Sequence, residues 1–340
     1  MQEADIATAT AAARTPTVAT AAPATADPET SNSWGSARIH GPLRVAILGP
    51  GGVGGLLAAT LVHSGHDVVC IAGDATAEAL REQGIRVSSG RFGELAVAMR
   101  AETQLREPVD LCLIAVKHTA LPEALDRLDA GALDNALIVP FLNGVEHPAL
   151  LRARYGEGLV APATIRVEST RLAPGVIEHS SPFADIDLAS ATAPSARLAA
   201  VLPVFAAAGF AVRVRDDETS MLWSKLSFIA PIALLTTRYG QTVGQIRAEH
   251  GDELYAAAEE VVAVGRASGA QVDLVDVVRL YRSLPDATKS SMQRDAEAGR
   301  AIELDAIGGA VLRAATLRDV PVPTLTGVIA HLAVRGENWS

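Results

Sequence analysis

A lysine beside an apolar run is the first residue of this sequence whose chemistry needs an explanation. Lys225 stands in the stretch LWSKLSFIAPIALL, residues 222–235, which is otherwise almost entirely apolar. Burial disfavours the charged form of an amine, so it lowers the pKa of such a lysine toward neutral pH. A lysine of this kind can donate a proton in a reaction, whereas one that extends its ammonium to water only has a structural role. The stretch alone favours the structural role.

A glycine-rich segment predicts a dinucleotide site. The strand-like RVAIL is followed by GPGGVGG, a helical segment and the strand-like HDVVCIA, so the pattern G-x-G-x-x-G lies within a βαβ unit. There the first glycine permits a tight turn, the second lets the backbone approach the pyrophosphate, and the third lets the helix pack on the strand. The pyrophosphate would lie on the helix N-terminus. The cofactor-binding residues that we predict are Gly49, Pro50, Gly51, Gly52, Val53 and Gly54.

The residues after the second strand bear on the choice of cofactor. An acid at this place holds the ribose 2′-OH of NAD, and a base accommodates the 2′-phosphate of NADP. Asp74 is the only acid within reach, no arginine is adjacent, and Arg81 lies seven residues further on. The pattern therefore favours NAD mildly. The alternative is that Asp74 caps the next helix, and it stays open.

Two polar residues end buried-strand patterns. Lys117 closes VDLCLIAVK, and Asn143 follows ALIVPFL in ALIVPFLNGV. Ligands of open α/β sheets bind beyond the carboxyl ends of the strands, so both residues are candidates for a site. The alternatives are a solvated loop lysine and a turn asparagine before Gly144.

The order of these elements predicts an α/β chain with two domains and a tail. Residues 1–42 are rich in Ala, Thr and Pro and lack the apolar side chains of a core, so we expect a disordered tail. Residues 43–214 are predicted to form a Rossmann-type NAD(P)-binding domain. Residues 215–340 have helical spacing and are predicted to form an all-helical domain that carries substrate and catalytic residues, with the active site between the two domains.

Composition excludes several other classes of protein. The net charge of −10 argues against a nucleic-acid partner, which requires a basic patch. No run of about 18 uninterrupted apolar residues predicts a membrane span. The two cysteines, Cys70 and Cys112, lie in apolar runs, and no spacing suggests a metal site. We therefore expect a cytoplasmic protein with a small-molecule substrate, for which a homodimer is one open alternative.

Several segments together resemble the ketopantoate reductase (2-dehydropantoate 2-reductase) family over about residues 43–335. They are RVAILGPGGVGG, DLCLIAVKHTAL, IVPFLNGVE, LWSKL and SSMQRDAEAGRAIELDAIGGAV. The last is the most specific, because its Ser-to-Glu spacing and its EAGR break match the usual form of the family. The resemblance implies reduction of a 2-keto acid to a 2-hydroxy acid with NADPH, on the route to pantothenate, and NAD stays open because of Asp74.

The resemblance also implies roles for individual residues. Lys225 falls on the catalytic lysine, which protonates the carbonyl oxygen while hydride reaches the carbon, and an ammonium suits that task because negative charge develops on this oxygen. Lys117 and Asn143 match residues that line the nicotinamide and substrate. Ser291 matches a serine that binds the substrate carboxylate. Glu303 matches a glutamate near the cofactor ribose and active site, where it would orient Lys225; the alternative is a solvated acid at a helix start.

The sequence departs from the family pattern at four places. Gly308 stands where Asn-Gly is usual, and Gly73-Asp74 replaces the usual arginine after the second strand. The other two departures lie on one helix face. Ile229 and Ala233, four and eight residues after Lys225, stand where asparagine is usual, so one helix face is apolar instead of polar. An apolar site discriminates weakly for a hydroxyl group. The sequence therefore predicts an NAD(P)H-dependent oxidoreductase acting on the CH–OH group. It leaves open a more apolar 2-keto acid as the substrate, or a non-catalytic NAD(P)-binding sensor.

Overall fold

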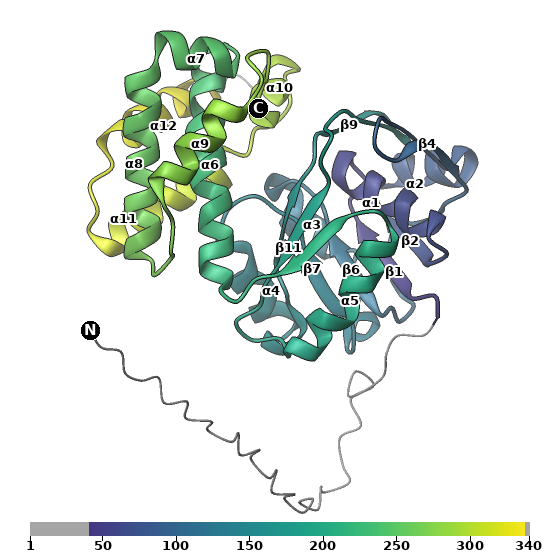
Figure 1. The fold of residues 1–340 in the computed structure, drawn as a ribbon. Helices are drawn as coiled ribbons and strands as arrows, with labels where there is room; N and C mark the ends of the chain where they lie inside the picture. Colours follow the sequence, from purple (N-terminus) through teal and green to yellow (C-terminus); the bar gives the residue numbers. More distant parts are fainter. Residues whose placement is uncertain (1–40, 337–340) are drawn as a thin grey trace, which may run out of the picture. The chain divides into compact units, whose positions relative to one another are not determined.

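A computed structural model describes residues 41–336 of the chain. The predicted tail, residues 1–42, therefore lies almost entirely outside the described residues. Figure 1 shows two groups of elements in the described part, strands with helices first and helices alone after them. This order agrees with the predicted α/β fold with a helical C-terminal region.

The first group is built on a five-stranded parallel sheet with the order β5-β2-β1-β6-β7. Its strands are short and, except for the edge strand β5, buried on both faces, as is usual for parallel sheets. They are β1 Arg44–Leu48, β2 Asp67–Ile71, β5 Arg100–Glu102, β6 Leu111–Ile114 and β7 Leu137–Pro140. The cysteines of β2 and β6 are free and fully buried, and burial raises the pKa of each thiol to about 12. Their role is to pack as small apolar side chains.

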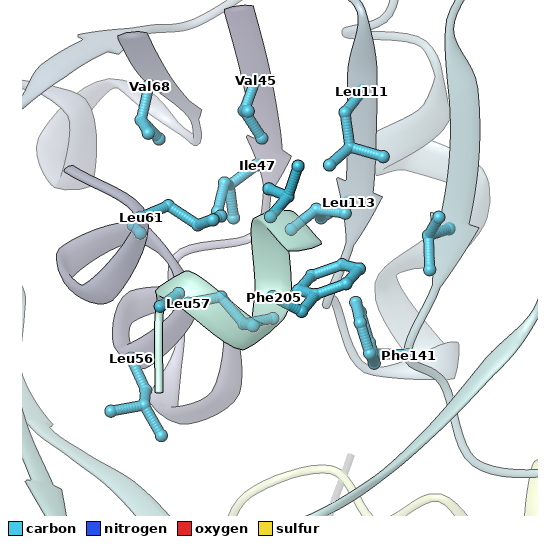
Figure 2. Close-up of a cluster of buried hydrophobic side chains, with 14 of the residues drawn as sticks. Val45, Ile47, Leu56, Leu57, Leu61, Val68, Leu111, Leu113, Phe141 and Phe205 are labelled. Carbon is cyan, nitrogen blue, oxygen red and sulfur yellow. The ribbon is translucent and has the colours of Figure 1, made fainter. Parts of the chain in front are cut away.

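Helices cover both faces of this sheet. Helix α1, Gly52–His63, and helix α5, Ser195–Ala207, lie over one face, where side chains such as Ile47, Leu57 and Phe205 form the core shown in Figure 2. Helix α3, Leu121–Leu125, contributes to a separate core on the other face. Helix α2, Asp74–Gln83, follows β2 and packs beside β5. The carboxyl ends of β1, β2, β6 and β7 all open on the same edge, which is where a ligand is expected.

Two further sheets complete this group. The first has the order β4-β3-β10-β9 and lies beside α1; its strands are β3 Ile85–Ser89, β4 Gly93–Val97, β9 Ser169–Ala173 and β10 Val176–His179. The second has the order β12-β11-β8, with β8 Ala163–Arg166, β11 Asp185–Leu188 and β12 Ala211–Val214. Strand β3 alternates buried and exposed residues over only five positions. So short an alternation does not predict from sequence which strands β3 pairs with.

The second group is helical throughout the described residues and is organised around α6, Glu218–Tyr239. Asp217 caps α6, because its carboxylate accepts a hydrogen bond from the backbone N–H of Thr219 at 2.9 Å. The surrounding helices are α7 Val243–Glu249, α8 Gly251–Ala267, α9 Leu274–Ser283, α10 Ser291–Glu297, α11 Ala310–Arg318 and α12 Pro323–Gly336. By length and composition alone helix α6 could cross a membrane, but 67% of its apolar stretch is buried inside the protein, which is usual for a core helix.

The segment between α10 and α11 is irregular and matters for the site. Helix α10 ends at Glu297, just before the predicted break at Gly299-Arg300. The chain becomes helical again as one π turn, Asp305–Gly309, which leads directly into α11. Turns of this kind often occur at functional sites, because the wider turn displaces the side chains beside it. Glu303 lies two residues before the π turn.

Candidate active site

The glycine-rich loop has the geometry that a pyrophosphate requires. Gly49 has φ +85°, and a Cβ atom there would collide with Val116. A Cβ atom on Gly54 would collide with the carbonyl oxygen of Gly49 and lie 3.2 Å from the Cβ of Ala115, so the start of α1 packs closely on the sheet. Nothing lies within 4 Å of the Cβ position of Gly51. The open space beside Gly51 is where a ligand can approach the backbone.

The other residues of the loop have structural reasons to be where they are. A Cβ atom on Gly52 would collide with the backbone of Ser169 in β9, and the Ser169 hydroxyl donates to the Gly52 carbonyl oxygen at 2.8 Å. Pro50 is buried, and Val53 packs against the core beneath α1. Gly52 therefore serves the contact between α1 and the sheet that contains β9, which the sequence pattern did not reveal.

The end of β2 contradicts one of the two sequence-based interpretations of Asp74, which is that it caps the next helix. Gly73 is the N-cap of α2 and Asp74 is its first residue, and no side chain caps this helix. Asp74 is exposed. A guanidinium that sequence reasoning missed lies close by: Arg127 Nη2 is 3.9 Å from the position of a Cβ atom on Gly73. Arg127 is 54 residues away in sequence, so no local pattern could have pointed to it.

Lys225 lies in the second turn of α6 and is partly buried. Burial lowers its pKa to about 8, and the negative charge of Glu303 partly opposes that shift. A lysine that merely reached for water would keep its ordinary pKa, because its ammonium would stay hydrated. Lys225 is therefore suited to donating a proton near neutral pH.

Glu303 connects the helical region with the ends of two strands of the parallel sheet. Its Oε1 accepts from the backbone N–H of His118 at 2.9 Å, and its Oε2 accepts from Nδ2 of Asn143 at 3.0 Å. His118 follows β6 and Asn143 follows β7. The loop after β7 also packs tightly on the π turn, since a Cβ atom on Gly144 would lie 2.6 Å from the Ala306 carbonyl oxygen. These contacts exclude the interpretation of Glu303 as a merely solvated acid.

Lys117 contacts helix α10, and Ser291 begins it. Lys117 Nζ forms an ion pair with Asp295 at 2.8 Å, and Asp295 also pairs with Arg300 at 3.0 Å. Ser291 is the exposed first residue of α10 and lies one turn before Asp295, on the same face of the helix. The neighbouring Ser290 caps α10 and exchanges a hydrogen bond of 2.8 Å with Thr236 of α6, which fixes α10 against the core helix.

A buried histidine near Lys225 was not predicted from sequence. His147 is the first residue of α4, His147–Tyr155, and is 1% exposed. Burial is the main reason that its pKa falls to about 3, and the charges of Lys225, His118 and Arg152 lower it further. Neither of its ring nitrogens has a hydrogen-bond partner among the described residues. The only sequence signal was its position four residues after Asn143.

The two apolar residues of α6 that stand where the family usually has asparagine differ in burial. Ile229 is partly buried and packs against the helical core, whereas Ala233 is 4% exposed and belongs to that core. The structure thus brings together Lys225, Glu303 and Asn143 through direct contacts or charge. Lys117 contacts α10 through Asp295, and Ser291 is the first residue of that helix. The glycine loop and Asp74 lie at the ends of β1 and β2.

Comparison with known proteins adds the relatives of this arrangement. Residues 45–191 match the family model described as Ketopantoate reductase PanE/ApbA, and residues 217–335 match its C-terminal counterpart. A 2-dehydropantoate 2-reductase from Caulobacter vibrioides is 29% identical over 295 residues, with 85% of this chain and 97% of the relative covered.

Solved structures show similar folds. A PanE/ApbA family ketopantoate reductase from Ralstonia eutropha JMP134 is 25% identical, with a TM-score of 0.78 and coverage of 87% of this chain and 99% of that one. D-mandelate dehydrogenase, solved with NADH and anilino(oxo)acetate, has a TM-score of 0.81, with 87% and 99% covered. At 17% identity the second likeness concerns the fold alone.

Proposed function

This chain belongs to the ketopantoate reductase family, and from that premise we propose that it reduces 2-dehydropantoate to pantoate, a step of pantothenate biosynthesis. The observation that carries the proposal is the position of Lys225 within the electrostatic reach of Glu303, whose carboxylate holds Asn143 at the end of β7. A keto acid bound beyond the strand ends would meet a proton donor there.

The proton donor is Lys225. Reduction of a carbonyl builds negative charge on oxygen, and a nearby ammonium both stabilises that charge and supplies the proton. With a pKa of about 8, Lys225 is mostly protonated at pH 7 but releases its proton more readily than an exposed lysine. Glu303 keeps the ammonium charged and holds the Asn143 amide, so it acts as a positioning residue.

The residues around the glycine loop fit a nicotinamide dinucleotide, which supplies the hydride when bound. The open backbone at Gly51 and the tight contact at Gly54 form the cradle for its pyrophosphate. We propose Lys117 and Asn143 as residues beside the nicotinamide, and Ser291 as the residue that binds the substrate carboxylate. The two buried, reduced cysteines suit a cytoplasmic location.

The test is oxidation of NADPH and NADH, followed at 340 nm with 2-dehydropantoate as the substrate. We expect Lys225→Ala to lose about 100-fold or more in kcat, the effect of removing a positioned acid. Lys289→Ala is the matched control, because Lys289 pairs with Glu297 on the surface of the helical region. Equal activity in the two variants would contradict the role of Lys225.

A panel of 2-keto acids separates the remaining alternatives. The curated relatives named 2-dehydropantoate 2-reductase support ketopantoate over a more apolar keto acid and over a sensor. Ile229 is the residue that favours the apolar alternative. Faster turnover of a branched apolar 2-keto acid than of ketopantoate would replace the proposed substrate, and nucleotide binding without turnover of any keto acid would indicate a sensor.

A further inference from the structure

An arginine from a distant part of the chain lies at the end of β2. Arg127 follows helix α3, and its Nη1 donates to the carbonyl oxygen of Thr103, directly after β5, at 3.3 Å. Its Nη2 lies 3.9 Å from the Cβ position of Gly73, two residues after β2. Because β2 and β5 are parallel neighbours, both contacts are at the carboxyl edge of the sheet. The guanidinium is thus held at the edge where Rossmann-type sheets bind their ligands.

The existing partners of Arg127 hold it weakly. Its ion pair with Glu123 is 3.4 Å long, and the Glu123 side chain is 83% exposed. A surface pair of this kind contributes little to stability, so a ligand phosphate could compete for the same nitrogen atoms. The Arg127 side chain itself is 29% exposed, which leaves it accessible from solvent.

The position of this guanidinium matters because the residue after β2 distinguishes NADP from NAD. The ribose 2′ position of the cofactor lies there, and an arginine accommodates the 2′-phosphate. The sequence after β2 offers only Asp74, whose negative charge would repel a phosphate. The fold therefore brings to this place a base that the local sequence lacks.

We propose that Arg127 binds the 2′-phosphate of NADPH in this protein, and that Asp74 opposes it. The inference rests on the proposed function, because it assumes that the end of β2 receives the adenosine half of a dinucleotide. A guanidinium can donate two parallel hydrogen bonds to a phosphate, an arrangement that the 2′-OH of NAD cannot use in the same way. The cofactor preference then depends on a balance between one arginine and one aspartate.

The experiment is isothermal titration calorimetry with 2′,5′-ADP and with 5′-AMP, which differ only in the 2′-phosphate and take no part in hydride transfer. We expect Arg127→Gln to bind 2′,5′-ADP about 10- to 100-fold more weakly, which is the range for a lost charged hydrogen bond. The same variant should bind 5′-AMP as the wild type does. Arg127→Lys should retain part of the affinity for 2′,5′-ADP. Arg106→Gln, in the exposed loop after β5, is the matched control and should change neither affinity.

A second variant tests the same balance in the opposite direction. Asp74→Asn should bind 2′,5′-ADP more tightly than the wild type, because one repelling charge is removed. An equal loss of affinity for both nucleotides in Arg127→Gln, or no loss for either, would overturn the inference, while 5′-AMP binding by the wild type would still support a dinucleotide site. If the wild type bound neither nucleotide, the inference and the proposed function would fail together.

Discussion

Replacing Glu303 by glutamine should move the basic limb of the pH–rate profile to lower pH. Two opposing influences set the pKa of Lys225 at about 8: burial lowers it and the negative charge of Glu303 raises it. Glutamine removes the charge and leaves the burial. A nearby opposite charge shifts a pKa by about one unit or more, so we expect the limb of the variant about one unit lower than that of the wild type.

The size of the effect at a given pH follows from the protonated fraction of Lys225. At pH 8 about half of the wild-type lysine is protonated, whereas about a tenth is protonated when its pKa is one unit lower. Relative to the acid plateau, kcat/KM at pH 8 should therefore fall about fivefold further in Glu303→Gln than in the wild type. The plateau itself should also fall, because a glutamine oxygen can accept from His118 or from Asn143 but not from both.

The assay is ketopantoate reduction between pH 6 and pH 10, with kcat/KM fitted to one ionisation. Asp305→Asn is the matched control: it removes a carboxylate only two residues away, but Asp305 pairs with Arg313 and makes no contribution to the pKa of Lys225. Its limb should stay at about pH 8. A basic limb of Glu303→Gln that stays in place or rises, or an equal shift in both variants, would refute a specific charge effect of Glu303 on Lys225.

Two other perturbations test the burial of His147 and the division of roles within the glycine loop. His147 has a pKa of about 3 in the folded protein against its ordinary 6.5, so the unfolded chain binds a proton first as the pH falls. The free energy of unfolding should therefore drop by about 2 kcal/mol between pH 7 and pH 5 from this residue, and urea titrations of His147→Phe should show a correspondingly smaller drop. Gly52→Ala should destabilise the fold by about 1–3 kcal/mol, because its Cβ atom meets the backbone of β9. Gly51→Ala, with open space around its Cβ position, should keep its stability and lose nucleotide affinity; equal stability of the two glycine variants would contradict this division.

Local sequence determined the features of this protein that depend on neighbouring residues. The strand at Arg44–Leu48, the glycine turn and the following helix were predictable, because a tight turn needs glycine and a buried strand needs branched apolar residues. The helical second half and the break before Glu303 were predictable for the same reason. The resemblance to a family, itself a property of the sequence, is what distinguished Lys225 from a structural lysine.

Tertiary structure alone decided which distant residues share the site. Glu303 contacts residues 160 and 185 positions earlier in the chain, and Arg127, which follows α3, reaches the end of β2. The burial of His147 and the contact of Gly52 with β9 are equally non-local. Periodicity and turn chemistry report only on neighbours within a few residues, whereas charge, burial and close approach depend on packing among elements that the chain brings together after they form.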